Sequence, residues 1–331
     1  MGESYPRRDQ ARGLWKINDI TKNIKDEGTY PQQGGAGKGF SAGNNNSPNV
    51  ALDTVTIKTT GNATDFGDLT VARQRLGGAS NGHGGLRGDE QRPQVTALDR
   101  PGRTIGIFGG GYFGASTGTY RSNCEILEIE TLGRSSNFGE LTAAVTNSFA
   151  MVGNRTRGVR ATGYTGGGSP NTTNVMDYCE FASRGNFADF GDATAAAYGS
   201  NGGPGGNDVR SFRMGAYNSG GNLTTVDYWA PATLGNAADF GDLSASNYSM
   251  GALSSDTRSI AIGGYYNNSA YTNIIEFFTF ASAGNATDFG DATTTLYNTG
   301  GLANNVRGVF AKGVDNAGNT VNVIERITIA S

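Results

Sequence analysis

The chain has 331 residues and a formal net charge of −3, with 53 glycines, 17% charged residues and 10% aromatic residues. This charge gives no electrostatic reason to expect nucleic acid or an anionic membrane as a partner, and no apolar run approaches the roughly 20 residues of a membrane helix, so no membrane insertion is expected. Because Phe and Tyr recur throughout, the glycines indicate turns between many short strands, and the sequence predicts an all-β fold.

Residues 1–33 differ in composition from the rest and are predicted to form a short, partly helical N-terminal attachment arm. Ile17, Ile20 and Ile24 share one face at helical spacing, and Trp15 precedes them. Two interpretations remain open for this arm: a plug packed under the main domain, and a segment that docks on another subunit. The aromatic side chain and the basic residues ahead of it favour docking, with Trp15, Ile17, Ile20 and Ile24 as the docking candidates.

Residues 34–331 are predicted to form one repeat domain, because an eight-residue pattern occurs five times with small variations. We call this pattern, Gly-Asn-Ala-Thr-Asp-Phe-Gly-Asp in its first copy, the marker. Successive marker phenylalanines are 72, 52, 50 and 49 residues apart, and the long first interval contains a Gly-rich insertion at about 80–102. The marker phenylalanines are Phe66, Phe138, Phe190, Phe240 and Phe289.

The order of features between markers is also constant. A small and polar strand follows each marker, a basic residue then opens a short apolar strand that ends in glycine, and an alternating strand follows after a turn. Units of about 50 residues with three or four antiparallel strands bury their faces by packing radially, which also protects their edges. The basic residues are Lys38, Arg103, Arg157, Arg210, Arg258 and Arg307.

The count of these basic positions favours a β-propeller of six blades. The unit at Lys38 lacks its first strand, and the chain stops at Ser331 directly after an alternating strand. A ring that is closed by both termini would have one short unit at each end. Five or seven blades remain open, because closure is not visible in a sequence.

The strand that ends in glycine, the alternating strand and the aromatic marker together resemble the kelch repeat, with Phe where kelch usually has Trp. The amino-acid sequence of the repeats and the segment Arg12-Gly13-Leu14-Trp15 resemble those of virion proteins of marine tailed phages, including cyanophages. This resemblance implies a structural role in the virion, most simply in the tail, after synthesis in the host cytoplasm. It also implies other virion proteins as partners.

The repeated residues have structural and chemical interpretations. The marker phenylalanines are expected to pack between neighbouring blades, while the Asn and Asp residues support turns; the alternative is a Ca²⁺ site at Asn62, Asp65 and Asp68. The periodic arginines are expected to pair with the acidic residues of the marker turns. In the alternative interpretation, they form a ring that grips carboxylates or an anionic glycan.

The sequence therefore predicts a non-enzymatic virion structural protein that needs no cofactor. The arm is expected to dock on the particle while the propeller projects toward the host surface or another protein. The insertion is expected to contact a neighbouring protein, with a flexible surface loop as the alternative. The runner-up function is a glycan-binding or receptor-binding adhesin; an enzyme would need a constellation of catalytic residues that does not repeat, and the sequence offers none.

Overall fold

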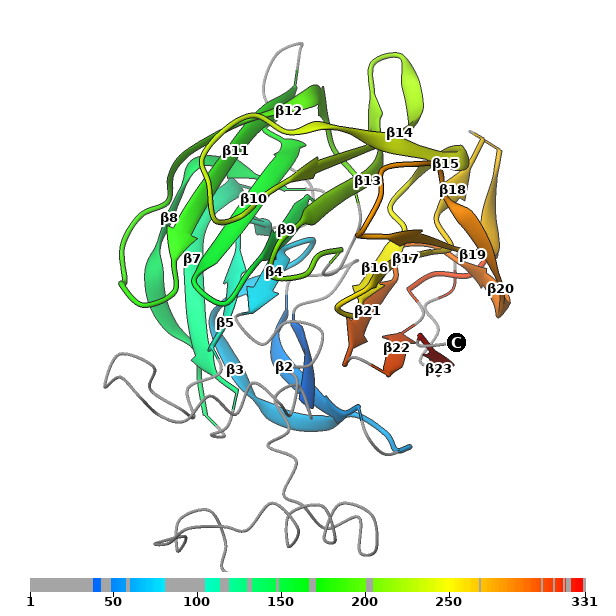
Figure 1. Cartoon of the computed structure of the whole chain (residues 1–331). Helices are drawn as coiled ribbons and strands as arrows, with labels where there is room; N and C mark the ends of the chain where they lie inside the picture. The colour runs from blue at the N-terminus through cyan, green and yellow to red at the C-terminus, as the bar shows by residue number, and fades with distance from the viewer. Residues whose placement is uncertain are drawn as a thin grey trace, which may run out of the picture.

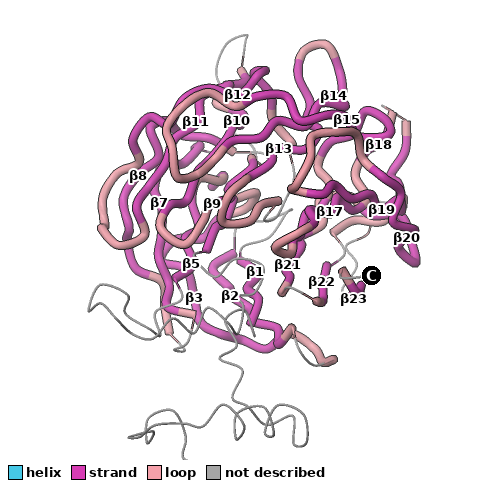
Figure 2. The backbone as a smooth tube through the Cα atoms, in the orientation of Figure 1, coloured by secondary structure: helices cyan, strands magenta, loops and turns pink. Residues whose placement is uncertain are grey.

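The described part of the chain consists of β-strands and the turns that connect them, in agreement with the all-β prediction (Figure 2). No helix long and apolar enough to cross a membrane occurs in this part. The arm at 1–33, the insertion beyond Ser80, and Arg103 lie outside the described residues. The computed structural model describes residues 38–42, 49–57, 60–80, 105–113, 119–129, 133–146, 149–166, 171–200, 205–267, 269–304, 306–311, 313–317, 319 and 323–329.

The strands form six consecutive antiparallel units, which we number in chain order (Figure 1). Unit 1 comprises β1 (Lys38–Ala42), β2 (Asn49–Thr56) and β3 (Thr64–Arg73). Unit 2 comprises β4 (Gly77–Ser80), β5 (Ile105–Gly109), β6 (Tyr112–Phe113), β7 (Thr119–Glu128) and β8 (Ser136–Val145). Unit 3 comprises β9 (Ala150–Gly153), β10 (Arg157–Tyr164), β11 (Thr172–Glu180) and β12 (Ala188–Ala197). Unit 4 comprises β13 (Ser211–Asn218), β14 (Gly221–Trp229) and β15 (Ala238–Tyr248). Unit 5 comprises β16 (Gly251–Ser254), β17 (Arg258–Ile262), β18 (Tyr265–Tyr266), β19 (Ala270–Thr279) and β20 (Thr287–Leu296). Unit 6 comprises β21 (Gly300–Ala303), β22 (Arg307–Ala311) and β23 (Ile324–Thr328).

Unit 3 shows the complete strand order, β9-β10-β11-β12, with the marker at the start of the fourth strand. The short first strands of neighbouring units lie against each other, as β4 lies against β9 and β16 against β21. The marker strands are therefore at the opposite edges of their units. Units 4 and 5 are also joined by backbone pairing between β15 and β18, so that they form a single eight-stranded sheet.

Each marker forms a β-bulge, which explains its Asp-Phe-Gly core. In unit 3, Asp189 pairs with Asp177 and Gly191 pairs with Met176, so Phe190 has no partner in the ladder. A bulge re-aims the side chain of the extra residue, and the Phe190 side chain is only 2% exposed. Gly191 has a φ of 144°, and a Cβ there would come within 2.5 Å of the next unit's backbone, so glycine is required.

Among the described residues, the hydrophobic core consists of five clusters, and each cluster combines side chains from two consecutive units. Four of the marker phenylalanines are at most 4% exposed, whereas Phe289 is only partly buried. The apolar faces of the units are thus covered by their neighbours. The marker phenylalanines of units 1 to 4 contribute to these shared clusters: Phe66, Phe138, Phe190 and Phe240.

The last unit lies beside the first (Figure 1). Strand β21 contacts β1, where a Cβ on Gly39 would collide with the side chain of Leu302. The Arg307 guanidinium donates a hydrogen bond to the carbonyl oxygen of Ile57, with Nη1 and O 3.2 Å apart. Among the described residues, unit 1 has no counterpart of β9 and unit 6 has no marker strand.

Candidate functional site

The periodic arginines link consecutive units through backbone carbonyls. Within the described residues, Arg157 pairs with Glu180 at 2.6 Å rather than with the marker residue Asp192, and Arg210 pairs with no carboxylate. The expected pairing with the marker carboxylates is therefore wrong at these two positions, because the guanidinium groups reach the end of the next unit's alternating strand instead. The carbonyl contacts run from Arg157 to Ala232, Arg210 to Phe280, Arg258 to Ile329 and Arg307 to Ile57.

A second periodic set consists of acidic residues, which we call the row of carboxylates. It joins each unit to the preceding one by hydrogen bonds. Each carboxylate lies in an alternating strand and accepts a hydrogen bond from a backbone N–H in the preceding marker strand. Four of these bonds are 2.8 to 3.1 Å long. The donor–acceptor pairs are Thr70 with Glu125, Thr142 with Asp177, Thr194 with Asp227, Ser244 with Glu276, and Thr293 with Glu325.

Three members of this set are neutralised by arginines that are themselves fully buried. Arg160 binds Asp177 through two contacts of 2.7 Å, and Arg213 binds Asp227 at 2.7 and 2.9 Å, with no side-chain exposure at either pair. Glu125 is likewise held by Arg73. Buried charges persist in proteins when they are paired and hydrogen-bonded in this way. These buried carboxylates are therefore structural.

Glu276 differs from Asp177 and Asp227, because Ala261 lies opposite it in the ladder, whereas Arg160 and Arg213 lie opposite the two aspartates. Burial raises the pKa of the Glu276 carboxyl despite its hydrogen bonds from Ser244. Folding therefore favours the protonated form, and the ionised carboxylate weakens the fold at pH values above its folded pKa.

Replacement of Glu276 by Gln is expected to raise the free energy of unfolding at neutral pH. The gain should disappear as the pH falls below the unfolded pKa, because the wild-type carboxyl is then protonated in both states. Urea unfolding at several pH values measures this difference.

Glu125→Gln provides the matched control, with an effect of opposite sign. Burial raises the pKa of Glu125, but hydrogen bonds from Ser135 and Thr70 and the charge of Arg73 outweigh it and lower the pKa overall. The ionised carboxylate therefore stabilises the fold above the unfolded pKa, and this contribution is lost as the pH falls through the folded pKa. If both glutamine variants changed stability in the same direction, these assignments would be refuted.

The marker turns are engaged in contacts between units. Asn186 accepts a hydrogen bond from the backbone N–H of Glu140 at 3.1 Å, and Asn236 accepts one from Asp192 at 3.0 Å. In the turn proposed as a Ca²⁺ alternative, the Asp68 carboxylate lies 3.4 Å from Arg134. Across the described residues, no group of three or more His, Cys, Asp or Glu side chains could hold a metal ion.

Nine tyrosines form a continuous chain of ring contacts across units 2 to 5, which we call the tyrosine arc. Ring centroids in contact are 4.7 to 6.4 Å apart, mostly in tilted or edge-to-face arrangements, and every member is half-buried. Tyrosine at such positions offers both an apolar ring and a polar tip. The members are Tyr112, Tyr120, Tyr164, Tyr198, Tyr217, Tyr248, Tyr265, Tyr271 and Tyr297.

The repeat itself positions this arc. In units 2 to 5 a residue with left-handed φ interrupts the second strand, and a tyrosine follows two residues later. Other tyrosines end the marker strands, at the opposite end from the marker turns, and Tyr198 pairs by backbone with Tyr217 of the next unit. The left-handed residues and their tyrosines are Gly110 and Tyr112, Thr162 and Tyr164, Gly215 and Tyr217, and Gly263 and Tyr265.

The phenol groups of Tyr120, Tyr198, Tyr248 and Tyr271 stay protonated at physiological pH. Burial raises the pKa of Tyr120, Tyr198, Tyr248 and Tyr271, and the neighbouring tyrosines add to this effect. Charged side chains contribute to the pKa shifts of only two of these four tyrosines, which lie toward the two ends of the arc. They are Arg75 near Tyr120 and Asp315 near Tyr271. The centre of the arc is thus a neutral surface that can donate hydrogen bonds.

Amide and hydroxyl side chains accompany the arc. The Asn171 amide donates to the Tyr164 hydroxyl at 2.9 Å, and the Asn222 and Asn247 amides donate to backbone carbonyls at 2.8 Å. The side-chain oxygens of Asn222, Asn247 and Thr146 are buried and have no protein hydrogen-bond partner. Such groups in proteins are usually satisfied by ordered water.

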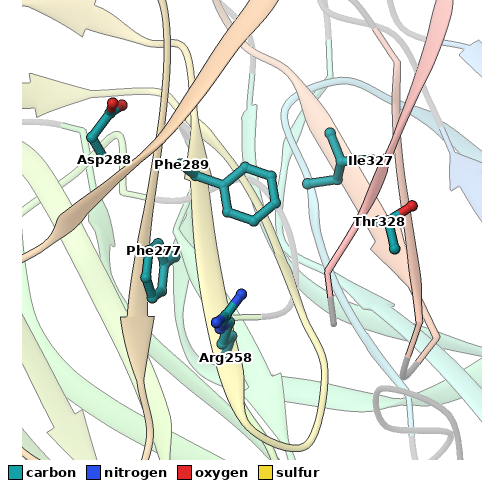
Figure 3. A pocket seen from close by; sticks show the side chains of 6 residues that line it. All are labelled: Arg258, Phe277, Asp288, Phe289, Ile327 and Thr328. Carbon is teal, nitrogen blue, oxygen red and sulfur yellow. The ribbon is translucent and has the colours of Figure 1, made fainter. Parts of the chain in front are cut away.

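A cavity of about 410 Å³ lies between units 5 and 6 (Figure 3). Between units 4 and 5, the marker turn packs Ala286 onto the shared cluster and binds the backbone of Asp242. No described residue of unit 6 supplies such a turn, which explains the partial exposure of Phe289. The cavity lies at a packing position between units, and it is lined by Arg258, Phe277, Asp288, Phe289, Ile327 and Thr328.

No protein-family model matches the sequence, and a search of curated proteins finds no significant match.

Proposed function

We propose that the chain is a non-enzymatic structural protein of a tailed-phage virion, displayed as a tail or particle appendage. The six units act as the blades of a kelch-like propeller, and residues 1–33 dock on the particle. The observation that carries this proposal is the tyrosine arc, a neutral aromatic strip held across four units. Half-exposed aromatic side chains with polar tips are enriched where proteins meet other molecules.

The contacts between units support a rigid display scaffold. Buried ion pairs, the row of carboxylates and the periodic arginines all join one unit to the next. The contact between Arg307 and Ile57 supports closure of six blades into a ring. The buried charged side chains take part in these structural contacts, which supports a role in recognition rather than catalysis.

The second candidate is a glycan-binding or receptor-binding adhesin, and the same arc favours it. Both functions place the propeller outward, and they differ in what the propeller contacts. The adhesin requires that the isolated propeller bind the host surface, whereas an appendage requires that the full chain be incorporated into the particle.

Particle incorporation tests the first function. A phage that lacks this gene is complemented with the full chain or with residues 34–331, and purified particles are examined by immunoblotting and electron microscopy. We expect the full chain at a fixed position on the particle and loss of the shortened chain. Equal incorporation of both chains would remove the attachment role of residues 1–33, and absence of the full chain would refute the virion assignment.

A further inference from the structure

We propose that the tyrosine arc is a binding site for a neutral polysaccharide, which lies along units 2 to 5. This inference rests on the proposed recognition role and names its ligand class. The arc passes without interruption from Tyr120 through Tyr164 and Tyr198 to Tyr217 and Tyr248. A site that extends over four consecutive units fits a long polymer better than a single small molecule.

The chemistry of the arc matches that of a sugar chain. A pyranose ring presents apolar C–H faces and a rim of hydroxyl groups, and a tyrosine offers an apolar ring with a polar tip. Burial raises the pKa of Tyr198 and keeps its hydroxyl protonated, whereas the Tyr248 hydroxyl is hydrogen-bonded to Tyr297. Among the described residues, burial and other tyrosines are the causes of the raised pKa at both phenols, so no described charged side chain there favours an anionic ligand.

Unused hydrogen-bonding capacity beside the arc supports the same ligand class. Thr146, which is 1% exposed, pairs by backbone with Tyr164, and its hydroxyl oxygen has no protein partner. Asn247, which is 7% exposed, precedes Tyr248 and has an unpartnered amide oxygen. Ordered water at such groups relays hydrogen bonds to a hydroxyl-rich ligand.

The surface differs from a typical protein-binding hot spot. Such hot spots are enriched in Trp and Arg as well as Tyr, and cluster at the centre of a compact patch. The arc is instead a narrow strip of one residue type that runs across four units. Binding of a protein in place of a sugar is an alternative result that the following test separates.

Affinity electrophoresis of the purified full chain tests the proposal. Native gels contain dextran, mannan, barley β-glucan or agarose-derived galactan, and dextran sulfate serves as the anionic counterpart of dextran. We expect at least one neutral polysaccharide to retard the protein. Tyr198→Ala and Tyr217→Ala should each weaken this binding by about tenfold, which corresponds to about 1.4 kcal/mol, and Tyr198→Phe should weaken it less because the ring remains.

Tyr228→Ala is the matched control, because Tyr228 is also half-buried but packs against Phe240, away from the arc. Thermal melts confirm that each variant is folded. Retardation by no neutral polysaccharide, retardation only by dextran sulfate, or equal loss in the Tyr228 variant would overturn the proposal. Since the assay needs no particle, its result is independent of virion incorporation, and an incorporated protein that binds none of these sugars would leave the appendage role standing.

Discussion

Replacement of Asp227 by alanine is expected to lower the free energy of unfolding by about 3–5 kcal/mol, the usual cost of breaking a buried ion pair. The change leaves the Arg213 guanidinium without its counter-ion in a place that water does not reach. It also removes the acceptor for the backbone N–H and the hydroxyl of Thr194 in the preceding unit. Urea denaturation followed by circular dichroism measures the loss.

The double variant Arg213→Met and Asp227→Asn separates the charge from the connection between units. It buries no charge, and the asparagine oxygen still accepts from Thr194, so it should recover much of the lost stability. A double variant no more stable than Asp227→Ala would show that the ion pair itself is worth more than its desolvation cost. An Asp227→Ala protein as stable as the wild type would contradict the assigned burial.

Replacement of Phe240 by alanine is expected to cost about 3–5 kcal/mol, as for other large-to-small changes in a packed core. The Phe240 ring contacts Phe212, Tyr228 and Phe278, so its removal leaves a void between units 4 and 5. Phe289→Ala is the matched comparison at the same position of the repeat. It should cost less than half as much, because this side chain is only partly buried and borders the cavity.

The same denaturation experiment, performed on both variants, gives the comparison. Equal losses at the two positions would mean that Phe289 is as well covered as its counterparts. In that event, residues outside the described set would have to close the cavity between units 5 and 6.

The sequence was sufficient to predict the all-β class and the repeat, because both follow from local patterns. The Asp-Phe-Gly marker predicted recurring buried phenylalanines, and the bulge at Phe190 provides the physical reason. The partners of the periodic arginines were not predictable from spacing alone. Two residue types that repeat with one period keep a constant geometry, but the period does not show which of them are in contact.

The row of carboxylates that joins the units was also missed. The alternating strand of unit 2, β7, contains two glutamates, Glu125 and Glu128, and only the packing of the neighbouring unit selects Glu125 as the buried one. The shared position of Asp177 and Asp227 in their strands was the available signal. The tyrosine arc likewise depends on backbone pairing between units, as between Tyr198 and Tyr217, which no single-unit pattern reveals.

The row of carboxylates imposes a direction on folding during synthesis. Thr142 and Thr194 meet their acceptors only 35 and 33 residues later in the chain, so each nascent unit is completed by the next one to leave the ribosome. The contact between Arg307 and Ile57 spans 250 residues and must form last. A stalled or shortened chain therefore always presents one unfinished edge, which makes truncated products targets for aggregation or proteolysis.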